Sequence, residues 1–204
     1  VFYGPSYSES YVLSILNKSN LSFHKSKNIS EEISLELSNK KIIGLFLNKM
    51  EFGPRALGAR SILANPSEKK INETLNRRLK RTEFMPFAPV IRDINVKKFF
   101  KNFDYNHYSA KFMTMTYKVS DDLNQLAPAV VHVDNTARPQ VIDKDINLIY
   151  YKILENFEEL TNIPVLINTS FNSHEEPIVM SPEDAIKSLK NGNIDILVID
   201  NFII

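Results

Sequence analysis

Apolar residues recur at helical spacing in two long segments of the chain. Ile71, Leu75 and Leu79 recur every four residues with polar residues between them, which predicts an amphipathic helix with one buried face. Apolar residues between positions 146 and 160 follow the same period and predict a second helix that ends near Asn162. Both helices should therefore pack on a common core.

Capping residues predict three more helices. Ser8 can cap a helix over residues 8–18, and Ser30, followed by two glutamates, opens a helix over residues 30–39. Residues 181–184, Ser-Pro-Glu-Asp, combine a cap, a proline in the first turn and an acid at the third helical position. Gly192 should end this last helix.

The remaining apolar segments have the length and the pattern of β-strands. Residues 41–47 and 195–204 are mostly apolar and typical of buried strands, and residues 164–168 form a shorter strand of this kind. Residues 113–119 alternate between apolar and polar, which predicts a half-buried strand, and the prolines in residues 86–92 favour an extended segment. Strands and helices alternate irregularly, so we expect a single α/β domain, bordering on α+β, with a twisted mixed sheet flanked by helices.

Composition and charge exclude several classes of protein. The chain has no cysteine, so it has neither disulfides nor thiolate metal sites. Its 25 basic and 24 acidic residues give a net charge of +1, which argues against nucleic-acid binding. No apolar run approaches the roughly 20 residues of a membrane span, and no signal peptide is evident. We therefore expect a cytoplasmic protein with no membrane partner, although a chain that starts at Val1 fits a piece of a longer protein.

A glycine-containing motif follows the first predicted strand. Residues 50–61, MEFGPRALGARS, place two glycines at the spacing of a phosphate-binding P-loop. The match fails because Ala59 stands where the P-loop lysine should be and Ser61 is one place late. Arg55 and Arg60 could still bind phosphate while the glycines let the backbone approach it. On this motif alone, a surface turn with two solvated arginines is an equal alternative.

A second motif is a basic cluster at the end of the amphipathic helix. Arg77, Arg78, Lys80 and Arg81 lie within five positions. Four adjacent cations cannot all face one ligand from a helix, so two or three at most would take part in a polyanion site. For most of them a solvated helix face is the favoured interpretation.

A third motif, HVDNTARPQ, spans residues 132–140. His132, Asp134, Thr136 and Arg138 would share one face of a strand, because side chains alternate between the faces. A single histidine here is more often a structural residue than a metal ligand. Four polar side chains on one face nevertheless make a ligand site a reasonable hypothesis.

A fourth motif, INTSFNSHEEP, follows the predicted strand over residues 164–168. Asn168, Thr169, Ser170 and Asn172 lie where that strand ends, and ligands in α/β sheets usually bind at such ends. Turn formation would explain one or two of these residues, whereas a run of four favours a binding site.

Common catalytic motifs are absent from the sequence, which contains no nucleophile elbow, no catalytic cysteine, no zinc-binding HExxH and no dinucleotide fingerprint. Glu51, Glu83 and Glu176 are candidates for Mg²⁺ contacts, although ordinary ion pairs are more common. The four polar motifs therefore predict a pocket of arginine, amide and hydroxyl groups that suits phosphate and developing negative charge.

These four motifs, in this order, resemble the C-terminal domain of the O-carbamoyltransferase family, which includes nodulation-factor and antibiotic-tailoring carbamoyltransferases. The resemblance covers nearly the whole chain. It implies a YrdC-like domain, here residues 1–204, that uses Mg-ATP to activate carbamoyl phosphate as a carbamoyl adenylate and releases pyrophosphate. It also implies a separate N-terminal sugar-kinase-like domain in cis, with iron or a similar metal, which transfers the carbamoyl group to an acceptor hydroxyl.

The resemblance also implies roles for individual residues. Arg55, Lys80 and Arg138 match positions expected to act in catalysis, and the chain itself would supply no metal ligand. The residues that would bind the substrate or nucleotide are Arg60, Ser61, Arg81, His132, Asp134, Thr136, Asn168, Ser170 and Asn172.

The chain departs from the family pattern at a few positions. Lys49 and Met85 stand where arginine is common, Asn135 replaces a glycine, and residues 173–175 lack a glycine. Asparagine tolerates a left-handed backbone, so Asn135 can keep its turn. Met85 removes a possible phosphate contact, which leaves a non-catalytic ATP- or phosphate-binding module as the alternative hypothesis. A nucleic-acid-binding sheet is a third and weaker one.

Overall fold

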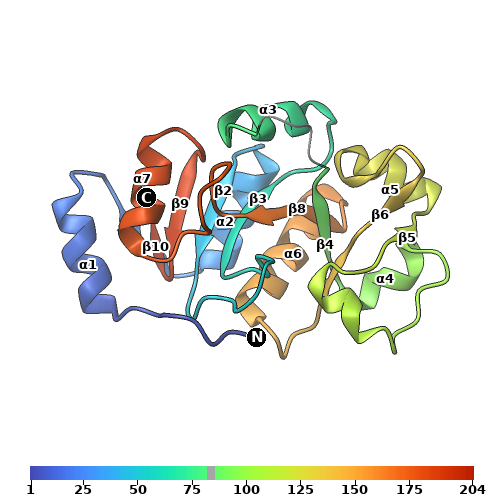
Figure 1. Cartoon of the computed structure of the whole chain (residues 1–204), viewed down its shortest axis with the longest axis horizontal. Coiled ribbons are helices and arrows are strands. Elements are labelled where there is room, and N and C mark those ends of the chain that lie inside the picture. The colour runs from blue at the N-terminus through green and yellow to red at the C-terminus, as the bar shows by residue number, and fades with distance from the viewer. Residues whose placement is uncertain (82–85) are drawn as a thin grey trace.

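An eight-stranded mixed sheet runs through the computed structural model, which describes residues 1–81 and 86–204 (Figure 1). The strand order is β1-β10-β9-β2-β3-β8-β4-β7, and β5 and β6 form a separate two-stranded sheet. The elements are α1 (Glu9–Lys18), β1 (His24–Lys25), α2 (Ile29–Ser38), β2 (Ile43–Phe46), β3 (Arg60–Ala64), α3 (Lys70–Arg78), β4 (Ala88–Arg92), α4 (Asp93–Phe99), the 3-10 helix η1 (Tyr108–Phe112), β5 (Tyr117–Lys118), α5 (Asp121–Leu126), the 3-10 helix η2 (Pro128–Val130), β6 (Thr136–Ala137), β7 (Gln140–Ile142), α6 (Leu148–Thr161), β8 (Val165–Ser170), α7 (Pro182–Lys190), β9 (Ile196–Ile199) and β10 (Phe202–Ile203).

Parallel and antiparallel pairs are combined in the large sheet. β2 is parallel to β9 and β4 is parallel to β7, whereas β3 and β8 are antiparallel to both of their neighbours. The antiparallel pairing of β3 with β8 sets Ser61 opposite Ser170 and Leu63 opposite Asn168. The expected mixed sheet flanked by helices is therefore confirmed.

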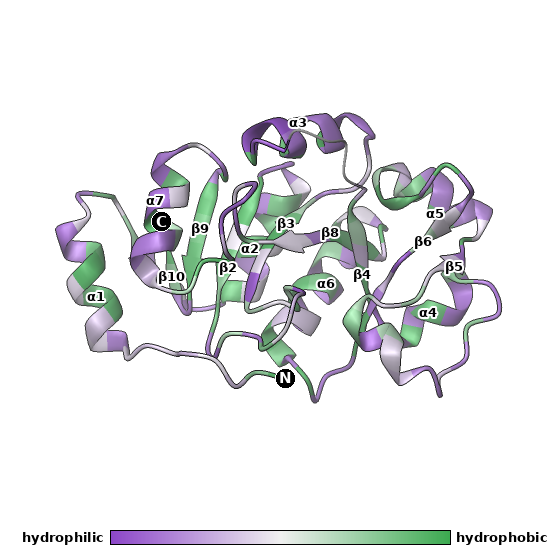
Figure 2. Ribbon diagram, in the orientation of Figure 1, coloured by the Kyte–Doolittle hydropathy of each residue, from purple (hydrophilic) through white to green (hydrophobic). Residues whose placement is uncertain are grey.

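The core lies between the sheet and the helices that cover it. α2 and α6 pack together behind the sheet in Figure 1, where the Ser34 hydroxyl donates to the Ile153 carbonyl oxygen at 2.8 Å. α1 and α7 lie beside β9 and β10, on the left-hand side of Figure 1. Figure 2 shows β9 in hydrophobic colours and α3 mostly in hydrophilic ones, as expected for a buried strand and a surface helix. No helix among the described residues is long and apolar enough to span a membrane.

Most of the predicted helix starts are confirmed. The Ser8 hydroxyl accepts a hydrogen bond from the Tyr11 N–H, and Ser181 and Asp184 form a complete capping box. Asn162 ends α6 in the left-handed conformation, with φ 60°. The helix predicted over residues 30–39, α2, begins slightly earlier than expected, because Asn28 rather than Ser30 is its N-cap.

Two strand predictions were wrong in extent. Residues 113–119 contain only the two-residue β5, because Met113 takes a left-handed conformation with φ 55° after η1 and its side chain packs with Leu57 and Ala88. Residues 195–204 form a hairpin of β9 and β10 that turns at Asp200, with φ 48°. The alternating and apolar patterns correctly indicated burial but not chain reversal.

Candidate functional site

Three arginine side chains converge on one pocket with a volume of about 100 Å³. Arg55 comes from the loop between β2 and β3, Arg81 follows α3, and Arg138 lies between β6 and β7. The other lining residues are Pro54, Ala56, Pro86, Phe87, Ala88, Met113, Asn168, Thr169 and Ser170. Cations from three separate segments thus meet amide and hydroxyl groups at the C-terminal end of β8.

Acidic side chains of the described residues do not pair with these arginines. The pKa of Arg138 is lowered by burial and by the nearby positive charge of Arg55. Burial also lowers the pKa of Arg81. Within residues 1–81 and 86–204, no acidic side chain forms an ion pair with any of the three. Cations held together without a carboxylate gain free energy when an anion binds between them.

Neighbouring side chains hold Arg81 in place. One terminal nitrogen, Nη2, donates to Thr169 Oγ1 at 2.9 Å, and the guanidinium carbon lies 5.0 Å from the centre of the Phe87 ring. A guanidinium group has five N–H donors, so most of them remain available to a ligand.

Glu51 shapes the loop that carries Arg55. Its carboxylate is only 6% exposed, and Oε1 accepts hydrogen bonds from the N–H groups of Leu57 (2.7 Å), Ala59 (2.6 Å) and Arg60 (3.1 Å). The Gly58 N–H donates to the Ser61 hydroxyl at 2.9 Å. These four backbone donors therefore serve the fold, whereas the sequence motif suggested that the loop backbone would face phosphate.

The two glycines of this loop are required by its backbone. Gly53 and Gly58 have φ values of +131° and +110°, which side chains strongly disfavour. A Cβ on Gly58 would also lie 2.3 Å from a ring carbon of Tyr150. The spacing that resembled a P-loop instead reflects a tight turn against α6.

A buried pair of amides fixes the other side of the loop. Gln140 Nε2 donates to the Leu57 carbonyl oxygen at 2.9 Å, and Asn168 Nδ2 donates to the Ala56 carbonyl oxygen at 3.0 Å. The two amides are joined by an Asn168 Nδ2 to Gln140 Oε1 bond of 2.6 Å. β7, β8 and the Arg55 loop are thereby connected directly.

Arg60 lies outside the pocket and is fully buried at the start of β3. Nη1 donates to Leu47 O (2.9 Å) and Ala59 O (3.0 Å), and its guanidinium carbon lies 3.5 Å from the centre of the Phe46 ring. Nη2 donates to Pro5 O and to Asn48 O, both at 3.3 Å. Burial lowers its pKa to about 10, although Glu51 and Asp200 act in the opposite direction. These contacts support the fold and Arg60 does not line the arginine pocket, so we propose a structural role for it.

His132, Asp134 and Thr136 form a turn instead of one face of a strand. The Thr136 hydroxyl donates to Asp134 Oδ1 at 2.6 Å and lies 3.0 Å from His132 Nδ1. The hydrogen bonds from Thr136 lower the pKa of Asp134. Asn135 has φ 64°, the left-handed conformation expected from its replacement of glycine. None of the three lines the arginine pocket; His132 faces a cavity of about 720 Å³ beside α3 and η2.

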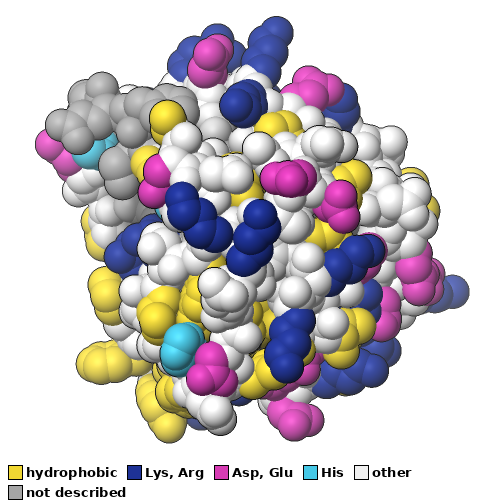
Figure 3. Space-filling view, turned by 90° about the vertical axis from the view of Figure 1, so that its right-hand side faces the viewer, with side chains coloured by type: hydrophobic (Ala, Val, Ile, Leu, Met, Phe, Trp, Pro, Cys, Tyr) yellow, Lys and Arg dark blue, Asp and Glu magenta, His cyan; other side chains and the backbone are white. Residues whose placement is uncertain are grey.

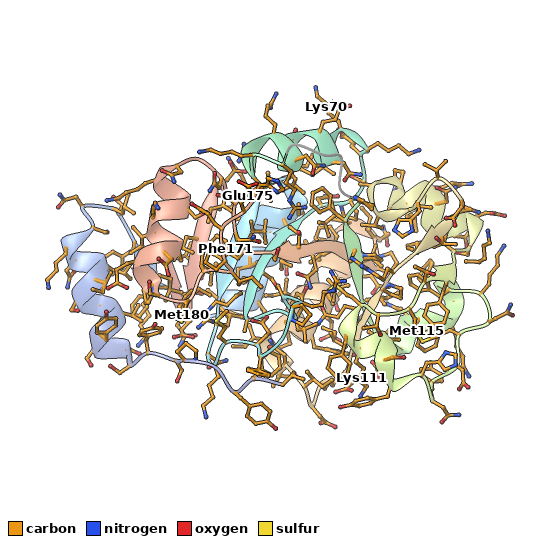
Figure 4. The ribbon with its side chains drawn as sticks, viewed as in Figure 1. Lys70, Lys111, Met115, Phe171, Glu175 and Met180 are labelled. Carbon is orange, nitrogen blue, oxygen red and sulfur yellow. The ribbon has the colours of Figure 1, made fainter. Side chains whose placement is uncertain are left out.

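The loop from β8 to α7 begins next to the pocket, because Ser170 at the end of β8 lines it. The Ser170 hydroxyl donates to Asn172 Oδ1 at 2.5 Å, and Asn172 Nδ2 donates to the Ser173 and Glu176 carbonyl oxygens. Asn172 thus shapes the loop and lines a neighbouring cavity of about 640 Å³. Figure 4 labels Phe171, Glu175 and Met180 along this loop, which reaches the end of α3 where the His174 N–H donates to the Leu79 carbonyl oxygen at 2.8 Å.

The family model described as carbamoyltransferase C-terminus matches residues 34–204. The chain belongs to this family. An uncharacterized protein of Methanocaldococcus jannaschii is 40% identical over 189 residues, which cover 93% of this chain and 36% of that protein. Nodulation protein NolO of Bradyrhizobium diazoefficiens is 35% identical over 185 residues, which cover 90% of this chain and 34% of that protein. The chain thus spans about a third of the length of these relatives.

Solved structures of HypF share the fold of this carbamoyltransferase domain. Full-length HypF in its phosphate- and nucleotide-bound form matches with a TM-score of 0.62 and 20% identity, over 85% of this chain and 25% of that one. At this identity the likeness concerns the fold, and it agrees with the α/β architecture expected from the sequence.

Five residues expected at the site line the pocket of the carbamoyltransferase domain: Arg55, Arg81, Arg138, Asn168 and Ser170. Lys80 is exposed at a turn with φ 55° and does not line it, and the Ser61 hydroxyl is buried and accepts the Gly58 N–H. Met85 and Glu83 lie outside the described residues. The described residues contain no cluster of three or more His, Cys, Asp or Glu suited to a metal ion.

Sequence reasoning named Thr169 in a possible binding run and Glu51 as a possible Mg²⁺ contact, but it did not single out Gln140. In the structure Thr169 contacts Arg81, Gln140 supports the Arg55 loop, and Glu51 caps the backbone N–H groups of that loop. Gln140 ends the HVDNTARPQ motif and Glu51 is the second residue of the glycine motif. Both residues therefore lie within motifs that the sequence displays, but only the tertiary structure shows that their side chains reach the same loop.

We expect Glu51→Gln to lower the free energy of unfolding by about 1–2 kcal/mol and to leave phosphate binding intact. The amide oxygen can accept the same three N–H groups, but without the strength that a negative charge adds. Urea unfolding and calorimetry with inorganic phosphate would measure both effects. Lost binding with unchanged stability would instead place the carboxylate in the ligand site, for example as a Mg²⁺ contact.

Proposed function

We propose that this domain binds carbamoyl phosphate and Mg-ATP and forms a carbamoyl adenylate with release of pyrophosphate. The single observation that carries the proposal is the pocket in which Arg55, Arg81 and Arg138 meet, with no carboxylate among its described lining residues. Membership of the carbamoyltransferase C-terminus family supplies the substrate class. A HypF structure described as phosphate- and nucleotide-bound supports the choice of ligands.

The size and lining of the pocket suit phosphate and carbamoyl groups. Its volume of about 100 Å³ is well below the ~300–1,000 Å³ of sites that enclose a drug-sized ligand. The nucleoside would therefore extend beyond the pocket. None of the lining residues that the structure describes is acidic, so Mg²⁺ would be held through nucleotide phosphates and water, and it would neutralise their charge.

The chemistry requires positioned cations and no protein nucleophile. Atom balance requires one water to release inorganic phosphate from carbamoyl phosphate and leave carbamate. A carbamate oxygen then attacks the α-phosphorus of ATP, and the bond from this phosphorus to the oxygen that bridges to the β-phosphorus breaks. Arg55, Arg81 and Arg138 would stabilise the negative charge that accumulates on the phosphates. Lys80 precedes Arg81 in the chain and does not line the pocket, and its catalytic role stays a prediction from the family resemblance.

The transfer step belongs, in this proposal, to sequence outside the 204 residues. The relatives are about three times longer, which leaves room for the expected N-terminal sugar-kinase-like domain with its own metal. That domain would select the acceptor hydroxyl. Cytoplasmic location and lack of nucleic-acid binding remain predictions, although the basic and acidic side chains intermingled on the face in Figure 3 give no continuous basic surface there.

Pyrophosphate release tests this proposal directly. The full-length protein should release pyrophosphate from ATP only when carbamoyl phosphate and Mg²⁺ are both present. Release without carbamoyl phosphate would contradict the substrate, and ATP binding without any release would favour the non-catalytic phosphate-binding module. If neither ATP nor carbamoyl phosphate bound, both the catalytic role and the phosphate-binding role of the pocket would be excluded.

A further inference from the structure

One buried amide oxygen beside the arginine pocket has no hydrogen-bond partner in the part of the chain that the structure describes. The Asn168 side chain is 2% exposed and lines the pocket near the end of β8. Its Oδ1 is buried without a partner, whereas its Nδ2 makes two hydrogen bonds. A buried acceptor left unpaired costs free energy, so such a group in a pocket points to a donor on the ligand.

The hydrogen-bond network determines which way this amide points. The carbonyl oxygens of Ala56 and Leu57 can only accept hydrogen bonds. Gln140 must turn its Nε2 toward Leu57 O, so its Oε1 faces Asn168. Asn168 must then present Nδ2 to both Gln140 Oε1 and Ala56 O. An exchange of Oδ1 and Nδ2 would set oxygen against oxygen at both contacts, so the unpaired atom is the acceptor.

This acceptor differs from the charged groups around it. The guanidinium groups of Arg55, Arg81 and Arg138 are donors only, and they suit the oxygen atoms of a phosphate. A ligand for the whole pocket therefore combines an anion with an N–H donor. Of the groups in the proposed substrate, the carbamoyl NH₂ supplies that donor.

We propose that Asn168 selects the carbamoyl group, with Oδ1 accepting a hydrogen bond from its amino group. This assignment rests on the proposed function and names the residue that distinguishes the substrate from other acyl phosphates. An acetyl group presents a methyl in place of NH₂ and leaves Oδ1 unpaired. A carboxyl group, ionised at neutral pH, places a negative oxygen against Oδ1. A site built to pair with a substrate N–H discriminates strongly against analogues that lack it.

The first test compares ligands on the unaltered full-length protein. Calorimetry should give carbamoyl phosphate an affinity about tenfold higher than that of acetyl phosphate. Equal affinities would overturn the assignment of Asn168 and leave the phosphate site in place. If neither compound bound, and ATP released no pyrophosphate, the proposed function itself would fail.

The second test uses two variants of the same amide pair. Asn168→Leu removes the acceptor and should bring the two affinities within about twofold of each other. Gln140→Leu is the matched control. Like Asn168→Leu it removes the hydrogen bond between the two amides, and it removes the Gln140 bond to Leu57 O as well, but it keeps Asn168 Oδ1. It should weaken both ligands to the same degree and preserve their ratio. If Asn168→Leu kept the original ratio of the affinities for carbamoyl phosphate and acetyl phosphate, the assignment would be wrong and Asn168 would only support the loop.

Discussion

Arg138→Ala should weaken binding of ATP and of carbamoyl phosphate by about 10- to 100-fold without lowering the melting temperature. A charge-assisted hydrogen bond to phosphate contributes about 1.5–3 kcal/mol, which corresponds to this loss of affinity. Stability should not fall, because burial and Arg55 both disfavour the charged form of Arg138 in the ligand-free protein. Loss of the arginine removes this repulsion together with the ligand contact.

Calorimetry and thermal unfolding of the same samples would measure the two effects. Arg77→Ala is a suitable control, since Arg77 is an exposed arginine on α3 outside the pocket. It should change neither affinity nor melting temperature. Arg138→Lys keeps the charge but not the two parallel bonds, so it should recover only part of the affinity. A lower melting temperature with unchanged affinity would make Arg138 a structural residue.

Local patterns predicted the helices of this fold better than its strands. The cap at Ser8, the capping box at residues 181–184 and the apolar period of α6 depend on neighbours within a few positions, which sequence displays. β3 and the hairpin of β9 and β10 depend instead on strand pairing and on left-handed turns at residues other than glycine. Propensity cannot reveal such pairing.

The motifs predicted the pocket but not the role of every arginine. Arg55 and Arg60 lie five positions apart in one motif, yet Arg55 lines the pocket and Arg60 is enclosed by backbone carbonyl oxygens. The direction of each side chain depends on where β3 begins, and the sequence did not indicate that strand. His132 was misplaced for a related reason, because Asn135 turns the chain before Thr136.

Arg60→Ala should lower the free energy of unfolding by about 3–5 kcal/mol while the folded fraction retains its affinity for phosphate. The substitution removes the Arg60 hydrogen bonds to the backbone carbonyl oxygens of Pro5, Leu47, Asn48 and Ala59 and leaves a void against the Phe46 ring. The Pro5 and Ala59 oxygens keep one backbone donor each, from the N–H groups of Met50 and Leu47. Unpaired buried acceptors and a cavity both destabilise a folded protein.

Urea unfolding of Arg60→Ala should shift its midpoint strongly, and calorimetry with inorganic phosphate below the transition should give the original affinity. Arg60→Lys tests the geometry, because one ammonium group carries three donors and cannot reproduce the planar guanidinium that reaches four oxygens beside an aromatic ring. It should recover only part of the stability. If Arg60→Ala instead bound phosphate weakly at unchanged stability, this arginine would belong to the ligand site, and the division of the motif between Arg55 and Arg60 would be wrong.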